Sequence, residues 1–390
     1  MFIAKIINFH KIIYWMKIVA DDKIPFLKGA LEPFAEVVYL PGKQISKDDL
    51  IDTDALLIRT RTKCTERLLA DTAIRFIGTA TIGFDHIDTK FCDNKGIIWT
   101  NAPGCNSSSV QQYIASALLK ISGNNKFNLK DKTLGIIGVG NVGSKVEKIA
   151  TALGMKVLLN DPPRARNEGQ KNFCDLNSLL SDSDILTLHV PLNKAGKDQT
   201  YHLFDDNNFR KVKKGAWLIN SSRGEVVNTK ALKLYMKSGS LAGAVIDVWE
   251  NEPYIDLELM QLCQLTTPHI AGYSTDGKAN GTAMVVNSLS KYFGLPLKNW
   301  YPGNIPAPVN PCISIDCAGR SMEQIVREAV FHTYNIEKDS EKLRHSPSDF
   351  EKQRGDYPLR REFTSYTVDL KRATEEVKQI LKNIGFRVTG

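Results

Sequence analysis

The chain has 390 residues, of which 42% are hydrophobic and 24% are charged, and its formal net charge is +8. This composition is typical of a globular protein, and the length allows two or three domains, which excludes a small disulfide-stabilised secreted fold. The lysines and arginines are scattered, so the charge fits an anionic small molecule as well as a nucleic acid. No basic stripe interleaved with aromatic residues is present, and we expect no nucleic-acid partner.

The first fifteen residues are apolar, but Lys5, His10 and Lys11 interrupt every candidate signal-peptide core and no cleavage motif follows. We interpret residues 1–15 as an extension that precedes the first domain. No other window reaches the roughly 18 consecutive apolar residues that span a bilayer, so we expect a soluble, cytoplasmic protein with no membrane partner.

Short β-rich runs alternate with helix-like segments from residue 17 to about residue 123, which is the pattern of a parallel α/β sheet. The predicted strands of this series are 17–20, 37–40, 55–58, 76–78 and 97–100. A second series predicts strands at 133–137, 156–159, 184–188, 216–219, 241–246 and 265–266. The fold class is therefore predicted to be α/β, with two Rossmann-like or flavodoxin-like lobes and a cleft between them.

A proline-rich stretch at 299–311 ends this pattern. Beyond it the sequence predicts a helix at 320–333, a polar loop at 337–357 and an amphipathic helix near 368–384. We interpret this tail as a third, smaller domain of the α+β class.

The seven cysteines are widely spaced and form no Cys-x-x-Cys pair, so we expect free thiols in a reducing compartment. Cys312 and Cys317 lie close in sequence, but the nearest candidate ligand, His332, stands alone. We therefore expect no metal site.

A glycine-rich turn with the sequence GVGNVG at 138–143 fits the pattern G-x-G-x-x-G. It follows the predicted strand 133–137 and opens a predicted helix at 144–153, as in a dinucleotide-binding βαβ unit. The glycines permit a tight turn and a close approach to a pyrophosphate, and the helix N-terminus offers N–H groups to phosphates. The candidate cofactor contacts in this turn are Gly138, Gly140, Asn141, Val142 and Gly143.

Asp161 follows the next predicted strand, 156–159, about 20 residues after the turn, where a carboxylate can accept hydrogen bonds from ribose hydroxyls. A carboxylate would repel a 2′-phosphate, so we expect NAD rather than NADP. Arg164 and Arg166 lie close enough in sequence to soften this preference.

Three charged or titratable residues follow strands of the second series, where open α/β sheets place ligands: Arg223, Glu252 and His269. A guanidinium is a planar, permanently charged partner for a carboxylate. An imidazole is suited to take a hydroxyl proton at neutral pH, and a glutamate can orient that ring. Together they predict oxidation of a 2-hydroxy acid. Singly, each has an ordinary alternative, namely a surface charge, a turn residue and a core histidine.

These motifs resemble those of the D-isomer-specific 2-hydroxyacid dehydrogenase family. Besides the glycine-rich turn, the resemblance rests on SRG at 222–224, IDVW at 246–249, EP at 252–253 and PHIAG at 268–272. Segments at 78–88, 102–106 and 273–282, and a tail motif LRREF at 359–363, are similar to one branch of the family that carries a dimerisation domain. The likeness runs from Met16 almost to the C-terminus.

The resemblance implies catalytic positions for Arg223, Glu252 and His269 and a phosphorylated 2-hydroxy acid as substrate. The implied substrate contacts are Thr60, Thr81 and Tyr273, and the further implied cofactor contacts are Asp161, Val190, Asp247 and Gly272. Thr60 and Thr81 are also suited to cap strand ends, and Asp247 to form a turn. Thr60 stands where a serine is more familiar in this branch.

The resemblance also implies the domain order and a homodimer. We expect an extension at 1–15, a substrate-binding (lid) domain at 16–118, an NAD-binding Rossmann domain at 119–274, a helix returning to the substrate domain at 275–298 and a C-terminal dimerisation domain at 299–390.

Two alternatives remain open at this point. Another dehydrogenase of the family, of the phosphoglycerate type, would carry the same catalytic trio, although the tail lacks the ββα repeat expected of its regulatory domain. A non-enzymatic, NAD-sensing corepressor-like protein can also keep these residues. Formation of NADH on mixing with the phosphorylated 2-hydroxy acid, with none for simple 2-hydroxy acids, would exclude the corepressor-like protein.

Overall fold

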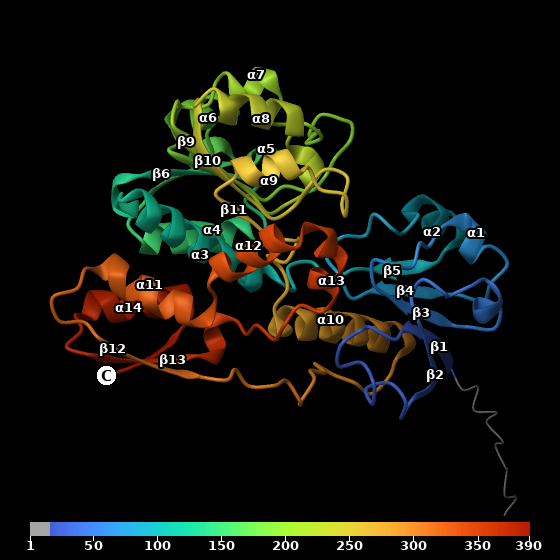
Figure 1. The fold of residues 1–390 in the computed structure, drawn as a ribbon. Coiled ribbons are helices and arrows are strands. Elements are labelled where there is room, and N and C mark those ends of the chain that lie inside the picture. The colour runs from blue at the N-terminus through green and yellow to red at the C-terminus, as the bar shows by residue number, and fades with distance from the viewer. Residues whose placement is uncertain (1–15) are drawn as a thin grey trace, which may run out of the picture. The chain divides into compact units, whose positions relative to one another are not determined.

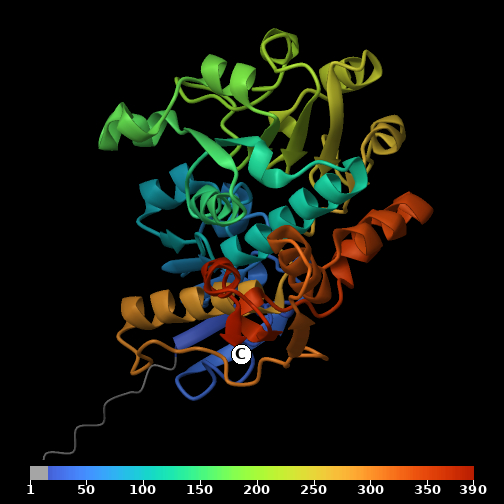
Figure 2. The ribbon, with the colours of Figure 1, turned by 90° about the vertical axis from the view of Figure 1, so that its left-hand side faces the viewer.

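The computed structural model describes residues 16–390 (Figure 1, Figure 2). Contacts between backbone segments divide the chain into two compact units. The first contains the described residues up to Cys105 together with Lys278–Asn304, and the second contains Asn106–Gly277 together with Ile305–Gly390. The interpretation of residues 1–15 lies outside the described residues.

The first unit is built on a five-stranded parallel sheet with the order β2-β1-β3-β4-β5. All residues of the inner strands β3 and β4 are buried, as is usual where both faces of a parallel sheet are covered. The long helix α10 (Thr275–Phe293) lies beside these strands (Figure 1, Figure 2) and packs on them through Val285 and Leu289. The other elements are β1 (Met16–Asp21), β2 (Ala35–Leu40), β3 (Ala55–Ile58), β4 (Phe76–Thr79), β5 (Ile98–Thr100), α1 (Glu66–Leu69) and α2 (Thr89–Lys95).

The second unit contains a six-stranded parallel sheet with the order β11-β10-β9-β8-β6-β7. Because β6 lies between β7 and β8, the strand order reverses there, which is where open α/β sheets bind ligands. The strands are β6 (Thr133–Ile137), β7 (Lys156–Asn160), β8 (Ile185–Leu188), β9 (Ala216–Asn220), β10 (Leu241–Ile246) and β11 (Leu265–Thr266). The helices are α3 (Ser107–Asn125), α4 (Gly143–Ala152), α5 (Pro162–Glu168), α6 (Leu176–Asp182), α7 (Asp206–Phe209), α8 (Thr229–Lys237) and α9 (Leu257–Leu262). The two predicted strand series are confirmed.

The C-terminal segment adds a three-stranded parallel sheet with the order β12-β13-β14. Its elements are β12 (Cys312–Asp316), α11 (Met322–Thr333), α12 (Ile336–His345), α13 (Phe350–Gly355), β13 (Thr367–Lys371), α14 (Glu375–Ile384) and β14 (Arg387–Thr389). The predicted helix at 320–333 corresponds to α11, whose N-terminus is closed by a capping box between Ser321 and Gln324.

Two predictions for this segment are wrong. The polar loop predicted at 337–357 contains α12 and α13, because a few buried side chains, among them Ile336 and Leu343, suffice to hold a helix whose other face is charged. The amphipathic helix predicted near 368–384 begins only at Glu375. Before it, Val368 and Leu370 are buried and alternate with more exposed neighbours, which is a strand pattern.

The C-terminal segment and the sheet of the second unit share one hydrophobic core. Ile114 and Leu118 of α3, Val146 of α4 and Val330 and Leu381 of the C-terminal segment all belong to it. Residue 118, the predicted boundary, lies inside α3, and all of α3 belongs to the second unit, which begins at Asn106. The functional roles assigned to the predicted domains stay predictions. None of the helices among residues 16–390 is long and apolar enough to cross a membrane.

Candidate active site

The glycine-rich turn joins β6 to α4 at the point where the strand order reverses. Gly138 has a φ of 87°, and a Cβ there would lie 2.6 Å from the His189 carbonyl oxygen. A Cβ on Gly143 would lie 2.1 Å from the Gly138 carbonyl oxygen, whereas a Cβ on Gly140 would meet nothing within 4 Å. Gly138 and Gly143 are therefore needed by the fold, and Gly140 leaves open backbone for a ligand. This arrangement fits a pyrophosphate.

Two alanine substitutions separate the glycine that the fold requires from the glycine that leaves space for a ligand. Gly140→Ala leaves the free energy of unfolding within about 0.5 kcal/mol of wild type, since the new methyl group meets no atom. We expect it to weaken NAD binding at least about tenfold, because Gly140 is where the backbone is predicted to approach the pyrophosphate. Gly143→Ala lowers the melting temperature as well. Denaturant unfolding and NADH fluorescence titration measure the two effects, and equal loss of stability in both variants would contradict this assignment.

Asp161 holds the backbone of the turn. Its Oδ2 accepts a hydrogen bond from the Val139 N–H (2.8 Å), and its Oδ1 accepts one from the Arg164 N–H (3.0 Å) as the N-cap of α5. The Arg164 guanidinium donates to the Val139 carbonyl oxygen (2.5 Å) and pairs with Glu168 (2.7 Å). Asp161 thus links the end of β7 to the turn. A carboxylate keeps further lone pairs for a ribose, and that role stays a prediction.

Glu252 and His269, both predicted from the sequence as catalytic residues, form a hydrogen-bonded pair. His269 Nδ1 lies 2.7 Å from Glu252 Oε2, and the Trp249 N–H donates to Glu252 Oε1 (3.0 Å). Burial raises the pKa of the Glu252 carboxyl, but its contacts with His269, Trp249 and Arg354 outweigh burial and lower it overall. Because an ionised carboxylate only accepts hydrogen bonds, a neutral His269 ring carries its proton on Nδ1 and leaves a lone pair on Nε2, which is the arrangement that a general base needs.

The loop that carries His269 is organised by Asp247. The buried Asp247 carboxylate accepts hydrogen bonds from the N–H groups of Ile270 (2.7 Å) and Ala271 (3.0 Å) and from the Thr267 hydroxyl (2.6 Å). The Asp247 carbonyl oxygen accepts the His269 N–H (2.7 Å). These bonds hold His269 in the left-handed region, at a φ of 57°. The structure thus shows Asp247 as the support of this loop, and its contact with the cofactor stays a prediction.

Arg223 lies on the loop after β9, which Asn220 holds in place. Asn220 Nδ2 donates to the Arg223 carbonyl oxygen (3.0 Å), and the Ser222 hydroxyl donates to Asn220 Oδ1 (2.9 Å). A Cβ on Gly224 would lie 2.0 Å from the Trp249 carbonyl carbon, so this loop lies directly against the segment that leads to Glu252. The loops of Arg223, Glu252 and His269 therefore lie at one edge of the sheet.

The remaining candidates divide between the two units. Gly272 and Tyr273 follow His269 in the second unit, as does Val190, which is half-buried after β8 and whose Cγ1 lies 2.8 Å from the Cβ position of Gly138. Thr60 and Thr81 lie in the first unit. Thr60 is exposed after β3, and the Thr81 hydroxyl donates to the Gly83 carbonyl oxygen (2.9 Å). Their substrate contacts stay predictions.

The tail motif at 359–363 binds the chain immediately after His269. The Arg360 guanidinium donates to the Ala271 carbonyl oxygen (2.6 Å), and the Ser274 hydroxyl donates to Glu362 Oε1 (2.7 Å). Arg361 forms a two-pronged ion pair with Asp276 (2.9 and 2.8 Å). The C-terminal segment thus fixes one side of the candidate site, a contact that no spacing in the sequence indicates.

Glu362 makes the stability of this connection depend on pH. Burial above all, and then Asp276, raise the pKa of its carboxyl to about 7, while the hydrogen bond from Ser274 lowers it. Between its ordinary pKa and pH 7 the folded state holds a proton that the unfolded state has released, so stability falls as the pH rises through this window. The fall is about 3 kcal/mol. Glu362→Gln should lose this pH dependence in urea unfolding between pH 5 and pH 8, and an unchanged slope would contradict the assignment.

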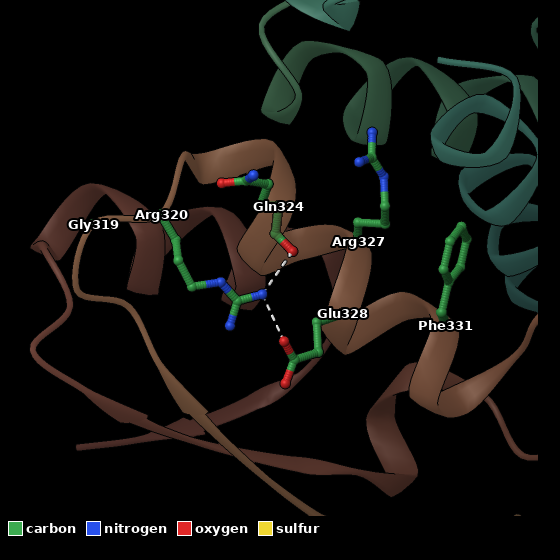
Figure 3. A pocket seen from close by; sticks show the side chains of 6 residues that line it. All are labelled: Gly319, Arg320, Gln324, Arg327, Glu328 and Phe331. Atoms are coloured by element: carbon green, nitrogen blue, oxygen red, sulfur yellow. Dashed lines mark hydrogen bonds and ion pairs between the residues drawn. The ribbon is translucent and has the colours of Figure 1, made fainter. Parts of the chain in front are cut away.

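A pocket of about 390 Å³ lies away from these residues, on the C-terminal segment (Figure 3). Its arginines are already paired, Arg320 with Glu328 (2.5 Å) and Arg327 with Glu323 (2.7 Å). None of the candidate site residues lines it, and we do not assign it to the active site. The lining residues are Gly319, Arg320, Gln324, Arg327, Glu328 and Phe331.

Comparison with known proteins agrees with this geometry. Residues 110–271 match the model of the D-isomer specific 2-hydroxyacid dehydrogenase NAD-binding domain, and residues 306–385 match a domain of unknown function. Over 354 residues, the chain is 49% identical to the erythronate-4-phosphate dehydrogenase of Bacteroides fragilis, covering 90% of this chain and 99% of that one. The chain belongs to the erythronate-4-phosphate dehydrogenase family. A Porphyromonas gingivalis member is 41% identical over 95% of this chain and all of its own, and a Proteus mirabilis member is 39% identical over 96% of this chain and all of its own.

Solved structures place the family among NAD-dependent dehydrogenases. A D-lactate dehydrogenase from Aquifex aeolicus, in complex with NAD and lactic acid, has a TM-score of 0.60 and 28% identity, covering 72% of this chain and 96% of that one. An NAD-bound 3-phosphoglycerate dehydrogenase from Entamoeba histolytica has a TM-score of 0.61 and 25% identity, covering 74% and 99%. The predicted α/β fold, the NAD cofactor and the oxidoreductase class are thereby confirmed.

Proposed function

We propose that this enzyme oxidises 4-phospho-D-erythronate at C2 to 2-oxo-3-hydroxy-4-phosphobutanoate, a step of pyridoxal 5′-phosphate biosynthesis. The observation that carries the proposal is the Glu252–His269 pair, 2.7 Å apart, in the same unit as a glycine-rich turn shaped for a dinucleotide. The substrate comes from the names of the relatives, which match the chain over nearly its whole length.

The reaction removes a proton from the C2 hydroxyl group and a hydride from C2. His269 Nε2 takes the proton, and Glu252 stabilises the imidazolium that results and keeps Nδ1 protonated throughout. NAD, held by the turn at 138–143, supplies the hydride acceptor, and NADH and the 2-oxo acid are the products. A hydroxyl group loses its proton more readily as the hydride leaves, so the base must be in place before transfer.

Arg223 binds the substrate carboxylate and polarises C2. Its loop is held by Asn220 and by the close approach of Gly224 to Trp249, and its Nη1 donates to the Ser222 carbonyl oxygen (2.8 Å), so Arg223 lies on the same sheet edge as the loop of His269. Tyr273, Thr60 and Thr81 are proposed to contact the rest of the substrate. We also propose a cytoplasmic homodimer formed through the C-terminal segment.

A panel of 2-hydroxy acids tests this function. The enzyme is mixed with NAD and, separately, with 4-phospho-D-erythronate, D-erythronate, 3-phospho-D-glycerate and D-lactate, and the absorbance of NADH is followed. We expect kcat/KM to be highest for 4-phospho-D-erythronate, and the same panel with NADP measures the cofactor preference. A higher value for phosphoglycerate would favour the alternative dehydrogenase, and no turnover of any acid would refute the proposal.

A further inference from the structure

Arg354 of the C-terminal segment reaches the catalytic pair. It lies on α13, and its Nη1 is 3.9 Å from Glu252 Oε2, the oxygen that faces His269. Its Nε donates a hydrogen bond to the Tyr273 hydroxyl oxygen (2.9 Å), and its guanidinium lies over the Tyr273 ring, 5.7 Å from the centroid. Only 21% of the side chain is exposed. The Arg354 guanidinium thus lies against both Glu252 and Tyr273.

These contacts affect the ionisation of Glu252 and the direction of the Tyr273 hydroxyl group. A positive charge beside Glu252 favours its ionised form, which the His269 tautomer requires. A guanidinium offers no acceptor, so the Tyr273 O–H must point to a different group while its oxygen accepts from Arg354.

We propose that Arg354 is a positioning residue of this active site, and that the C-terminal segment thereby takes part in the oxidation. The inference rests on the proposed function. It gives a role in catalysis to the segment at 306–385, which matches a domain of unknown function. The site of a D-2-hydroxyacid dehydrogenase that lacks such a segment would have to orient its glutamate without this cation.

The charged and titratable groups around His269 define what a pH profile reports. Asp247 and Glu252 come from the segment after β10, Glu351 and Arg354 come from α13, and Tyr273 follows His269 itself. The Arg354 guanidinium supplies a positive charge 3.9 Å from Glu252 Oε2. Its removal leaves a net increase of negative charge beside His269, which favours the imidazolium.

The test compares Arg354→Met, Arg354→Lys and a matched control, Arg327→Met. Arg327 is also a part-buried arginine of the C-terminal segment. It pairs with Glu323 (2.7 Å) and donates to Ser122 of α3 (3.2 Å), and Figure 3 shows its side chain directed away from Arg320. The control therefore removes a contact between this segment and α3 while leaving the catalytic pair untouched. Oxidation of 4-phospho-D-erythronate is measured from pH 6 to pH 10, beside thermal unfolding.

We expect Arg354→Met to lower kcat by about 10- to 100-fold. The acid limb of its kcat/KM profile should move upward by about one pH unit, because oxidation requires neutral His269. Arg354→Lys should restore the position of the limb, since it keeps the cation, and recover only part of kcat, since it lacks the guanidinium fork. Arg327→Met should keep the wild-type kcat and profile.

Three results would overturn the inference. The first is a kcat and pH profile of Arg354→Met equal to those of the wild type. The second is an equal loss in Arg327→Met with an unshifted profile, since that would show a purely structural role. The third is a rise in KM alone, which would place the guanidinium on the substrate. Failure of the wild-type enzyme to turn over 4-phospho-D-erythronate would instead refute the proposed function.

Discussion

Replacing His269 with asparagine is expected to lower kcat/KM for 4-phospho-D-erythronate by about 10³- to 10⁴-fold, because the alcohol then loses its general base. Asparagine is the substitution of choice, since His269 has a φ of 57° and asparagine tolerates the left-handed region better than alanine. The hydrogen bond from the backbone N–H of residue 269 to the Asp247 carbonyl oxygen is kept. The loss of kcat/KM therefore reflects the absence of the imidazole and not a change in the structure of the loop.

The loss should lie in the chemical step. NADH binding, measured by fluorescence, should stay within about twofold of wild type, because the turn at 138–143 is untouched, and the acid limb of the pH profile should disappear. An asparagine variant that keeps the wild-type acid limb would show that another group takes the proton.

Glu252→Gln, together with His269→Asn and the double variant, forms a double-mutant cycle. The amide of glutamine is able to donate to His269 Nδ1, which would move the ring proton to Nε2 and remove the base. We expect a loss of at least about 10²-fold, and the double variant Glu252→Gln/His269→Asn should be no worse than His269→Asn alone, since the two residues act as a unit. Additive losses would mean that Glu252 acts on a different group.

The glycine-rich turn and the two sheets were predictable because their signals are local. A buried parallel strand is a short apolar run, and the strands of both series agree with the structure to within a few residues at each end. The close approach of Gly143 to the Gly138 carbonyl oxygen likewise arises within the turn itself. Such features depend on neighbours in the sequence, so one sequence is enough to find them.

The C-terminal segment was harder to predict because its contacts are distant in sequence. Arg354 lies in a stretch that reads as a polar loop, and its contacts with Glu252 and Tyr273 join residues that are 102 and 81 positions away. Asp247 was expected at the cofactor, although its carboxylate accepts three hydrogen bonds from the His269 loop. No local pattern carries such information, since it arises only when the chain is folded.

Arg223 gives the second large effect. Arg223→Lys is expected to lower kcat/KM by about 10²- to 10³-fold, although the charge is kept, because an ammonium group cannot bind a carboxylate with two parallel hydrogen bonds. Arg223→Met should lose still more, with a rise in KM and a fall in kcat, since the guanidinium both binds the carboxylate and polarises C2. Steady-state NADH formation measures both constants.

The backbone of the loop around Arg223 is held by contacts of its neighbours, so substitutions of Arg223 test its side chain. Asn220 and Gly224 hold the backbone on either side without the guanidinium, whose Nη1 donates to the Ser222 carbonyl oxygen (2.8 Å), so the variants should lose no more than about 1.5 kcal/mol of stability. Arg166→Met serves as the matched control, because it removes an arginine paired with Asp198 (2.5 Å) from the same unit. If Arg223→Met turned over substrate as fast as this control, the guanidinium would be an ordinary surface charge, and the carboxylate would have to be bound by another cation.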